Sequence, residues 1–390
     1  MPEVRVTRAP IIACGGGKAY LLNGTSRNES RGRTSGFLLS RGLTGCPVIG
    51  IYCPTAMSKN VFFLSHIALA VLLFFGESYG ATYKYIRIGR QNDAETKPVA
   101  GIAMMGGGDD LDEAFRWLCG KADGGDFLIL RAHGDDDYNS YVNGLCKVNS
   151  VATLIIPDRD AAQDPAVAEI IRHAEAVFIA GGDQANYIHF WGGTPVQDAI
   201  NQHIAKRMPI GGTSAGLAVQ GEFAYGALND PDDAELHSKE ALADPYHIQV
   251  TVVRDFLKIP QLQNTITDSH FAIRDRMGRT LVFLARIMQD GWSKQPREVA
   301  IDEKSAVLVE ADGKAVVIGS GEGAYFLRPM QAPAVCQKGV PLSFMNISVY
   351  KASRGAHFDL SSWAGSGGTP YSLSVEQGTI RSTQPNGSVY

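Results

Sequence analysis

A serine flanked by small residues is the first position in this sequence that could do chemistry. Gly212-Thr213-Ser214-Ala215-Gly216 follows a short apolar segment, and a helix-like stretch, Leu217 to Gln220, comes after it. Small neighbours let the chain turn sharply between a strand and a helix, which exposes the serine hydroxyl as a nucleophile. The first N–H groups of such a helix, that of Ala215 foremost, can donate to an oxyanion, and the turn at Gly181-Gly182-Asp183 can supply a second donor. The pentapeptide also arises by chance in a glycine-rich chain, so the strand before it and the helix after it carry the interpretation.

A serine nucleophile needs a base, and His270 is the candidate. An unperturbed histidine titrates near neutral pH, so its ring can accept the serine proton under ordinary conditions. A single histidine is more often a core or surface residue than a catalyst. Here, however, charged residues are concentrated around it, more than a helix that only packs would need. They are Asp268, Arg274, Arg276 and Arg279.

The elements that must position these residues begin near residue 98. Short apolar segments bounded by Gly, Pro or Asp alternate with helix-like segments, a pattern typical of a parallel sheet buried on both faces. The expected strands are 99–105, 127–130, 152–156, 176–180 and one beginning at 208, the expected helices are 110–119 and 195–206, and a hairpin of 306–309 with 315–318 is expected to close the sheet. Right-handed crossovers place the carboxyl ends of parallel strands at one edge of the sheet, where we expect the functional residues.

The end of the chain has a different composition. Residues 328–390 are richer in Ser, Gly and Pro and contain strand-like pieces at 343–350 and 371–375. We expect a small β-rich C-terminal extension, and no motif in it indicates a function.

The overall composition indicates a globular protein. The chain has 390 residues, 45% of them hydrophobic and 19% charged, which suits one large domain with a sizeable core and appendages. A net charge of -4 provides no basic stripe for phosphate groups, so a nucleic-acid partner is not expected. The sequence has no His-Glu-x-x-His motif and no tight Cys/His cluster, so neither a metal nor another cofactor is expected.

The first 80 residues do not look like part of the folded domain. Residues 1–56 lack helical or strand periodicity, and we expect a disordered or spurious N-terminal extension. Residues 57–80 resemble a signal peptide, with a basic start, the apolar run 61–75 and the small-residue site Ser78-Tyr79-Gly80 before Ala81. A membrane anchor or a buried helix are the alternatives, but the run is short for a span and is interrupted by polar residues. We therefore expect a secreted or periplasmic protein with no stable membrane anchor after cleavage.

Three cysteines lie beyond the expected cleavage site: Cys119, Cys146 and Cys336. An odd number leaves at least one thiol unpaired or paired between chains. Cys119 and Cys146 can form a disulfide in an oxidising compartment, and two buried free thiols are an equally good interpretation.

Four motifs occur in an order known from one family. They are Gly181-Gly182-Asp183-Gln184, Gly211-Gly212-Thr213-Ser214-Ala215-Gly216, Asp268-x-His270-Phe271-x-x-Arg274-x-Arg276-x-Gly278-Arg279, and Ala300-Ile301-Asp302-Glu303. Residues 98–327 therefore resemble the cyanophycinase branch of the peptidase E (S51) family. The resemblance implies an α/β fold, a three-layer sandwich around a mostly parallel sheet like that of class I glutamine amidotransferase domains, with serine in place of the cysteine nucleophile.

The resemblance also implies a role for each matched position. Ser214 would be the nucleophile and His270 the base, with Gly182 and Ala215 as oxyanion donors. The implied substrate contacts are Gln184, Asp268, Arg274 and Arg276. An arginine fork suits this task, because a guanidinium can hold a substrate carboxylate with two hydrogen bonds.

The acid that would orient the histidine is harder to assign. The segment from Phe223 to Asp255 is longer than we expect for a minimal family member and contains many acids. Glu240 is the predicted triad acid, with Glu235 and Asp230 as alternatives, although any of them could be a solvated loop carboxylate. The chain also departs from the family at Ser269, where cyanophycinases commonly have Gln, and this departure leaves the identity of the substrate side chain open.

The resemblance implies hydrolysis of a peptide or isopeptide bond at an aspartyl residue through an acyl-enzyme on Ser214. The leading substrate is cyanophycin, cleaved to β-aspartyl-arginine dipeptides, and an aspartyl dipeptidase is the nearest alternative. An ordinary esterase would share the serine turn, but the chain has no His-Gly-Gly oxyanion loop and the arginines after His270 would be unexplained. A non-catalytic binding module on the same scaffold also stays open. The sequence does not determine the oligomeric state, although a homodimer is common among soluble enzymes.

Overall fold

The computed structural model describes residues 83–230 and 235–390. The expected N-terminal extension, residues 1–56, and the expected signal peptide, residues 57–80, lie outside the described residues. Within the described ranges, no helix is long and apolar enough to cross a membrane.

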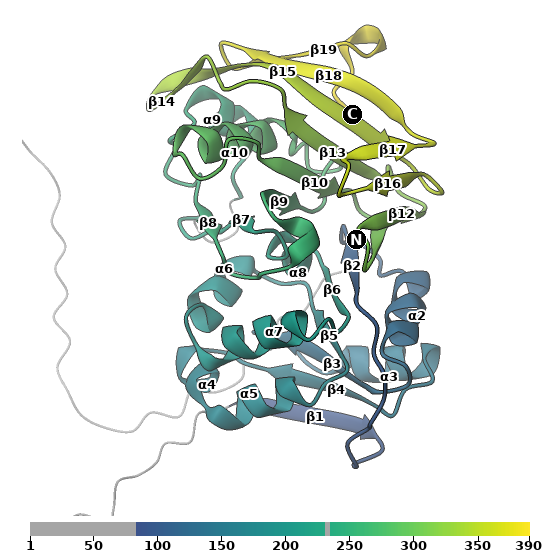
Figure 1. The fold of residues 1–390 in the computed structure, drawn as a ribbon. Helices are drawn as coiled ribbons and strands as arrows, with labels where there is room; N and C mark the ends of the chain where they lie inside the picture. Colours follow the sequence, from purple (N-terminus) through teal and green to yellow (C-terminus); the bar gives the residue numbers. More distant parts are fainter. Residues whose placement is uncertain (1–82, 231–234) are drawn as a thin grey trace, which may run out of the picture. The chain divides into compact units, whose positions relative to one another are not determined.

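The first sheet has ten strands with a parallel centre (Figure 1). The parallel strands, in spatial order, are β4 (Ser150–Ile155), β3 (Asp126–Arg131), β5 (Ala176–Ile179), β6 (Ile210–Thr213) and β2 (Gly101–Met105). Antiparallel strands flank them: β1 (Lys84–Gly89) on one side, and β11 (Ser305–Glu310), β12 (Lys314–Gly319), β16 (His357–Asp359) and β17 (Ala364–Ser366) on the other. The expected α/β class is present, but the sheet is mixed rather than mostly parallel, because hairpin-connected strands from the second half of the chain extend it.

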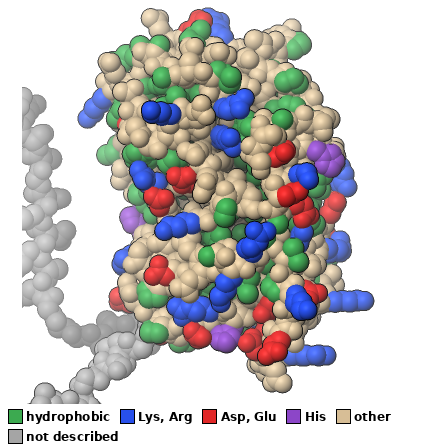
Figure 2. Space-filling view, viewed as in Figure 1, with side chains coloured by type: hydrophobic (Ala, Val, Ile, Leu, Met, Phe, Trp, Pro, Cys, Tyr) green, Lys and Arg blue, Asp and Glu red, His purple; other side chains and the backbone are tan. Residues whose placement is uncertain are grey.

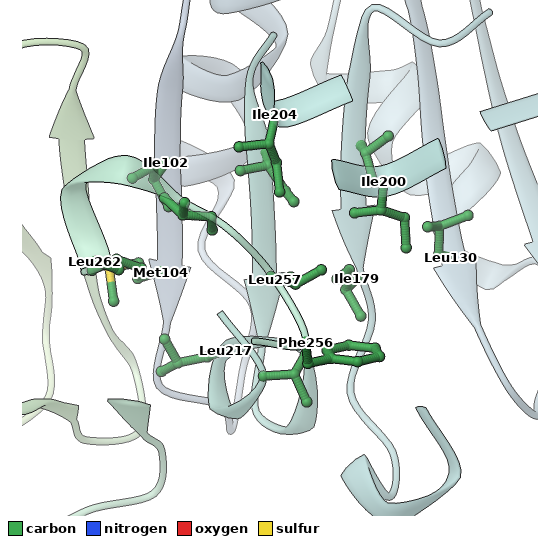
Figure 3. Packing of buried hydrophobic residues seen from close by; sticks show 14 of the residues in the cluster. Ile102, Met104, Leu130, Ile179, Ile200, Ile204, Leu217, Phe256, Leu257 and Leu262 are labelled. Carbon is green, nitrogen blue, oxygen red and sulfur yellow. The ribbon is translucent and has the colours of Figure 1, made fainter. Parts of the chain in front are cut away.

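Helices cover both faces of the parallel centre. Alternate side chains of its strands point to opposite sides, so apolar residues lie on both faces and each face is buried under helices. Phe127 and Ile129 of β3 lie in one buried cluster with Phe115 of helix α2 (Asp112–Lys121), and helix α3 (Asp137–Leu145) covers the same face. Leu128 and Leu130 lie in the opposite cluster, with helices α5 (Pro165–Arg172) and α7 (Pro195–Ala205). Figure 3 shows Ile200 and Ile204 of α7 in this second cluster, on the side of the sheet that carries Leu130 and Ile179.

A second sheet lies beside the first and was not predicted from the sequence. Its strand order is β19 (Thr379–Ser382), β18 (Thr369–Glu376), β15 (Val340–Ala352), β13 (Ala324–Pro329), β10 (Arg297–Ile301), β9 (Thr265–Asp268), β7 (Phe223–Tyr225) and β8 (Val252–Arg254), with β14 (Val335–Gln337) paired to β15. Helices α10 (Met277–Gln289) and α9 (Ser238–Ala243) pack against this sheet through a further buried cluster. The segment expected as a C-terminal extension is β-rich, but β16 and β17 join the first sheet while β15, β18 and β19 join the second.

The remaining helical elements are short. They are α4 (Arg159–Gln163), α6 (Gln184–Asn186), a π-helical turn (Tyr187–Trp191), α8 (Ala215–Ala218), and 3-10 turns at Pro260–Leu262 and Pro385–Gly387. Figure 2 shows one face of the molecule, on which Lys and Arg side chains lie among Asp and Glu side chains.

Cys119 and Cys146, for which the sequence left both a disulfide and two free thiols open, form a disulfide. Cys119, near the end of α2, pairs with Cys146, directly after α3, at a Cα–Cα distance of 6.0 Å. Cys336 is buried and unpaired among the described residues, and burial raises the pKa of its thiol to about 11.

Replacing both Cys119 and Cys146 with Ala should lower the free energy of unfolding by about 3 kcal/mol, because the bridge restricts the unfolded chain. Urea denaturation of the chain starting at Ala81 measures this loss. Reducing agent should bring the native protein to the stability of the variant and leave the variant unchanged. Equal stability of the two proteins under oxidising conditions would contradict the pairing.

Candidate active site

Ser214 occupies a strained turn between a strand and a helix. Strand β6 ends at Thr213 and α8 begins at Ala215, and Ser214 between them has φ 53° and ψ −115°, a backbone conformation that residues with a side chain rarely adopt. The Ser214 N–H donates to the carbonyl of Met105 at 3.1 Å, which ties the turn to β2. A Cβ atom at Gly216 would lie 2.0 Å from the carbonyl oxygen of Ile179, so only glycine lets α8 approach β5 this closely. The turn expected from the pentapeptide is therefore present and held on two sides.

Ser214 and His270 are in direct contact. The hydroxyl Oγ of Ser214 lies 2.6 Å from Nε2 of His270, and Nδ1 of the same ring lies 2.6 Å from Oε1 of Glu303. A proton on Nδ1 donated to the carboxylate leaves Nε2 free to accept the serine proton, which is the arrangement of a serine, histidine and acid triad. A Cβ atom at Gly107 would lie 2.4 Å from the imidazole Cε1, so the glycine after β2 makes room for the ring.

The acid beside the histidine is Glu303, which corrects the assignment of Glu240. Glu240 is exposed on α9, where its carboxylate is solvated. The alternatives have other partners: Glu235 pairs with Arg276, and Asp230 accepts the hydroxyl proton of Tyr225 at 2.7 Å. None of the three carboxylates hydrogen-bonds His270 in the described part of the chain.

A signal for Glu303 was present in the sequence. Glu303 belongs to the motif Ala300-Ile301-Asp302-Glu303, which is part of the family resemblance but carries no predicted role. Strand β10 pairs in parallel with β9, with Ala300 beside Asp268, so Asp302 and Glu303 emerge next to His270. Only this pairing between distant segments shows why an acid at the end of β10 reaches the histidine.

Asp302 holds the backbone that follows the histidine. Its Oδ1 accepts the N–H groups of Ala272 and Ile273 at 2.9 and 3.0 Å. The N–H of His270 donates to the carbonyl of Gly106 at 2.8 Å. The position of the imidazole therefore depends on the ends of β2 and β10 as well as on Glu303.

The environment of His270 favours the neutral imidazole. Burial is the main factor that lowers the pKa of His270, and the positive charges of Arg274 and Arg276 lower it further. The hydrogen bond to Glu303 acts in the opposite direction without cancelling the others. A neutral ring is the form that can accept a proton from Ser214.

Both expected oxyanion donors lie beside the nucleophile. Gly182 and Ala215 line the same pocket as Ser214, and the hydroxyl of Tyr187 fixes the glycine turn by donating to the carbonyls of Ala180 and Gly181 at 2.9 and 3.1 Å. Among the described residues, no acceptor is found for the N–H of Gly182 or of Ala215. Two free donors beside a nucleophile can stabilise a tetrahedral oxyanion.

An open pocket of about 1110 Å³ extends from the triad and is lined by charges of both signs. Its basic residues are Arg274, Arg276 and Arg279, and its acidic residues are Asp183, Asp230 and Glu235. Gln184, Ser269 and Tyr225 also line it. The structure thus brings the predicted contacts Gln184, Arg274 and Arg276 to the pocket and adds Arg279, whose place in the wall the sequence did not indicate.

Asp268 does not line this pocket, which corrects its predicted role as a substrate contact. The side chain is 2% exposed and accepts two hydrogen bonds from Arg279, at 2.9 Å from Nε and 2.6 Å from Nη2. Its Oδ1 also lies 3.3 Å from Nη1 of Arg276, whose other Nη pairs with Glu235. Asp268 therefore binds Arg276 and Arg279 on their side away from the pocket. Burial alone would raise the pKa of Asp268, but the charges of the two arginines lower it.

The described ranges contain no group of three or more His, Cys, Asp or Glu side chains that could hold a metal ion.

The chain is similar to a known family of peptidases. The model of peptidase family S51 matches residues 133–243, a range that includes Ser214 but ends before His270 and Glu303. The cyanophycinase of Trichormus variabilis is 27% identical over 217 residues, which are 54% of this chain and 65% of that protein. The cyanophycinase of Synechococcus elongatus is 29% identical over 223 residues, 55% of this chain and 61% of that protein. The chain thus spans less than two thirds of the length of these relatives.

A solved structure of a peptidase from an acI-B1 actinobacterium also aligns with the chain. The two are 15% identical, with a TM-score of 0.43, over 67% of this chain and 97% of that one. Such a score is too low to carry an argument.

Replacing Glu303 with Gln should reduce kcat roughly 10³- to 10⁴-fold, because an amide at this position no longer stabilises the correct tautomer and the charge of the histidine. Replacing Glu240 with Gln is the matched control and should leave kcat unchanged. Steady-state kinetics on any substrate that the native protein cleaves measures both. A large loss in the Glu240 variant alone would restore the sequence-based assignment.

The reactivity of Ser214 should rise with pH through an apparent pKa below the ordinary histidine value of 6.5, because His270 must be neutral to act. In Arg274→Gln this apparent pKa should be higher, because the substitution removes a positive charge that disfavours the imidazolium. The rise in reactivity should therefore occur at higher pH. The rate of inactivation by a fluorophosphonate, measured from pH 4 to 9, reports this rise without a substrate. Arg354→Gln, which removes an exposed arginine paired with Glu113, is the control and should not move it. An apparent pKa at or above the ordinary histidine value in the native protein would contradict the environment described for His270.

Proposed function

We propose that this chain is a member of the cyanophycinase and peptidase E family S51 and a serine peptidase that hydrolyses peptide or isopeptide bonds at aspartyl residues. The observation that carries the proposal is the contact of Ser214 with His270, and of His270 with Glu303, at the wall of a pocket lined by arginines. An esterase for neutral substrates would have no use for three arginines beside its nucleophile.

The reaction would proceed through an acyl-enzyme. Ser214 Oγ attacks the carbonyl carbon while Nε2 of His270 takes the hydroxyl proton, and the N–H groups of Gly182 and Ala215 receive the oxyanion. The imidazolium then gives its proton to the leaving amine, the C–N bond breaks, and an ester remains on Ser214. Water loses a proton to the same nitrogen as it attacks the ester, and the proton returns to Ser214 when the acid product leaves.

The charges of the pocket support a substrate that has both a carboxylate and a cationic group. Arg274 and Arg276 can bind a carboxylate, because guanidinium groups match its geometry, and the buried Arg279 adds positive charge behind them. Asp183 and Asp230 line the same pocket, and neither has an ion-pair partner among the described residues. A β-aspartyl-arginine unit has both kinds of group, and the relatives named above are cyanophycinases. Cyanophycin, degraded from an end of the polymer to dipeptides, is therefore the leading substrate.

The order of the central strands supports a finer proposal about the fold. The parallel strands are β4, β3, β5, β6 and β2 in spatial order, with the nucleophile directly after β6, and this order supports a layout like that of class I glutamine amidotransferase domains. The signal-like pattern of residues 57–80 and the pairing of Cys119 with Cys146 support a secreted or periplasmic protein, because disulfides persist in oxidising compartments. A polymer too large to enter a cell would be degraded in such a place.

The chain starting at Ala81 should release β-aspartyl-arginine from purified cyanophycin, and Ser214→Ala should lose at least about a thousandfold in rate. Mass spectrometry of the soluble products measures the release. Arg207→Ala, which removes an arginine outside the pocket, is a control for the loss of a positive charge and should retain the activity.

Other outcomes would redirect the proposal. Cleavage of β-aspartyl dipeptides but not of the polymer would indicate an aspartyl dipeptidase. Preference for simple esters would indicate an esterase, and failure of a fluorophosphonate to label Ser214 would indicate a binding module.

A further inference from the structure

The residue at the N-cap of helix α10, at the end of the loop that carries the catalytic histidine, does not cap the helix with its side chain. We call residues 270–276 the histidine-arginine loop, since it carries His270, Arg274 and Arg276. Arg276 is the residue before the first turn of α10, and its side chain makes no capping hydrogen bond. The first N–H groups of a helix have no partner within the helix, and an arginine has no acceptor to offer them. The side chain of Arg276 instead contacts Asp268 and Glu235 at the pocket wall.

Two hydroxyl groups from other parts of the chain take over the capping. Oγ of Ser238 accepts the N–H groups of Gly278 and Arg279 at 3.0 and 3.3 Å. The hydroxyl of Tyr390 accepts the N–H of Met277 at 2.9 Å and donates to Oδ1 of Asp275 at 2.9 Å. Tyr390 therefore bridges the last residues of the histidine-arginine loop and the first residue of α10.

The ring of Tyr390 is itself held in place. It meets the rings of Phe271 and Tyr325 edge-on, at centroid distances of 5.8 and 5.9 Å. The neighbouring carbonyl of Val389 accepts the hydroxyl proton of Tyr371 at 2.8 Å. Burial raises the pKa of Tyr390, so its hydroxyl keeps the proton that it donates to Asp275.

The two halves of the loop depend on different parts of the molecule. The histidine half is fixed by hydrogen bonds to the carbonyl of Gly106, to Asp302 and to Glu303, whereas Tyr390 meets this half through the ring of Phe271, a contact that does not use the Tyr390 hydroxyl. The arginine half ends at Asp275, a residue with φ 49°, and is fixed by Tyr390 and by a hydrogen bond from Ser238 to the Asp275 carbonyl. A change at Tyr390 should thus disturb the arginines more than the triad.

We propose that Tyr390 is a positioning residue that caps α10 and thereby orders Arg274 and Arg276 for binding a substrate carboxylate. The proposal rests on the proposed function for the identity of the substrate, but not for the order of the loop. It gives a role in the site to the last part of the chain, for which the sequence suggested none.

The test compares Tyr390→Phe with a matched control, Tyr350→Phe. Each variant keeps its ring and loses one hydroxyl that accepts a backbone N–H, since Tyr350 accepts that of Gly368 at 2.7 Å. Tyr390→Phe should raise KM for β-aspartyl-arginine oligomers about five- to tenfold, the effect of losing one ordinary hydrogen bond. It should leave kcat and the rate of fluorophosphonate labelling of Ser214 unchanged, and Tyr350→Phe should change none of these.

Hydrogen exchange of a peptide spanning residues 272–278 gives a readout that needs no activity, and exchange there should become faster in Tyr390→Phe than in Tyr350→Phe. An unchanged KM and unchanged exchange, or equal changes in both variants, would overturn the proposal. A fall in kcat and in labelling with KM unchanged would show that Tyr390 acts on the triad instead. If the native protein cleaves no aspartyl substrate, the proposed function fails, and exchange alone then decides whether Tyr390 orders the loop.

Discussion

The parallel pairing of β9 with β10 is the constraint on which the candidate site depends. Because Ala300 lies beside Asp268, the two strands end together, and the residues that follow them face each other. His270 follows one strand and Glu303 the other, so the triad contact needs no long loop. The segment after Glu303 enters β11 of the first sheet at once, and β11 pairs with β2, whose end contacts His270. One short connection thus places the base from the second sheet against the nucleophile of the first.

Burial of charge sets the electrostatics behind the pocket. Asp268 and Arg279 are almost fully buried and satisfy each other with two hydrogen bonds, an arrangement that offsets the cost of removing both charges from water. Glu298 is buried nearby, and burial, together with the charge of Asp268, raises its pKa well above the ordinary value. Arg274 lies 3.5 Å from Glu235 and is partly exposed, and its positive charge acts on the pocket and on His270.

The local parts of this arrangement could be predicted from the sequence, and the parts that depend on strand pairing could not. Ser214 was found because a sharp turn has its own signature of small residues, and the central strands were found because full burial makes them continuous apolar runs. Glu303 was missed because its distance from His270 is set by the pairing of two strands. Asp268 was misplaced for a related reason: its charge suggested a substrate contact, and only packing shows that Arg276 and Arg279 lie between it and the pocket. Strand β1 was missed because its partly exposed residues do not form an apolar run.

The strands of residues 328–390 cross between the two sheets. After β15 in the second sheet the chain passes to β16 and β17 in the first and then returns to β18 in the second. Without β15 and β16, which pair with β13 and β12, these two strands would become open edges, with rows of unpaired N–H and C=O groups of the kind that template association between chains. The region that resembles other peptidases is thus not a free-standing unit to which a tail has been added. The two sheets and the last strands form one interlaced body, and its outer strands protect the inner ones from self-association.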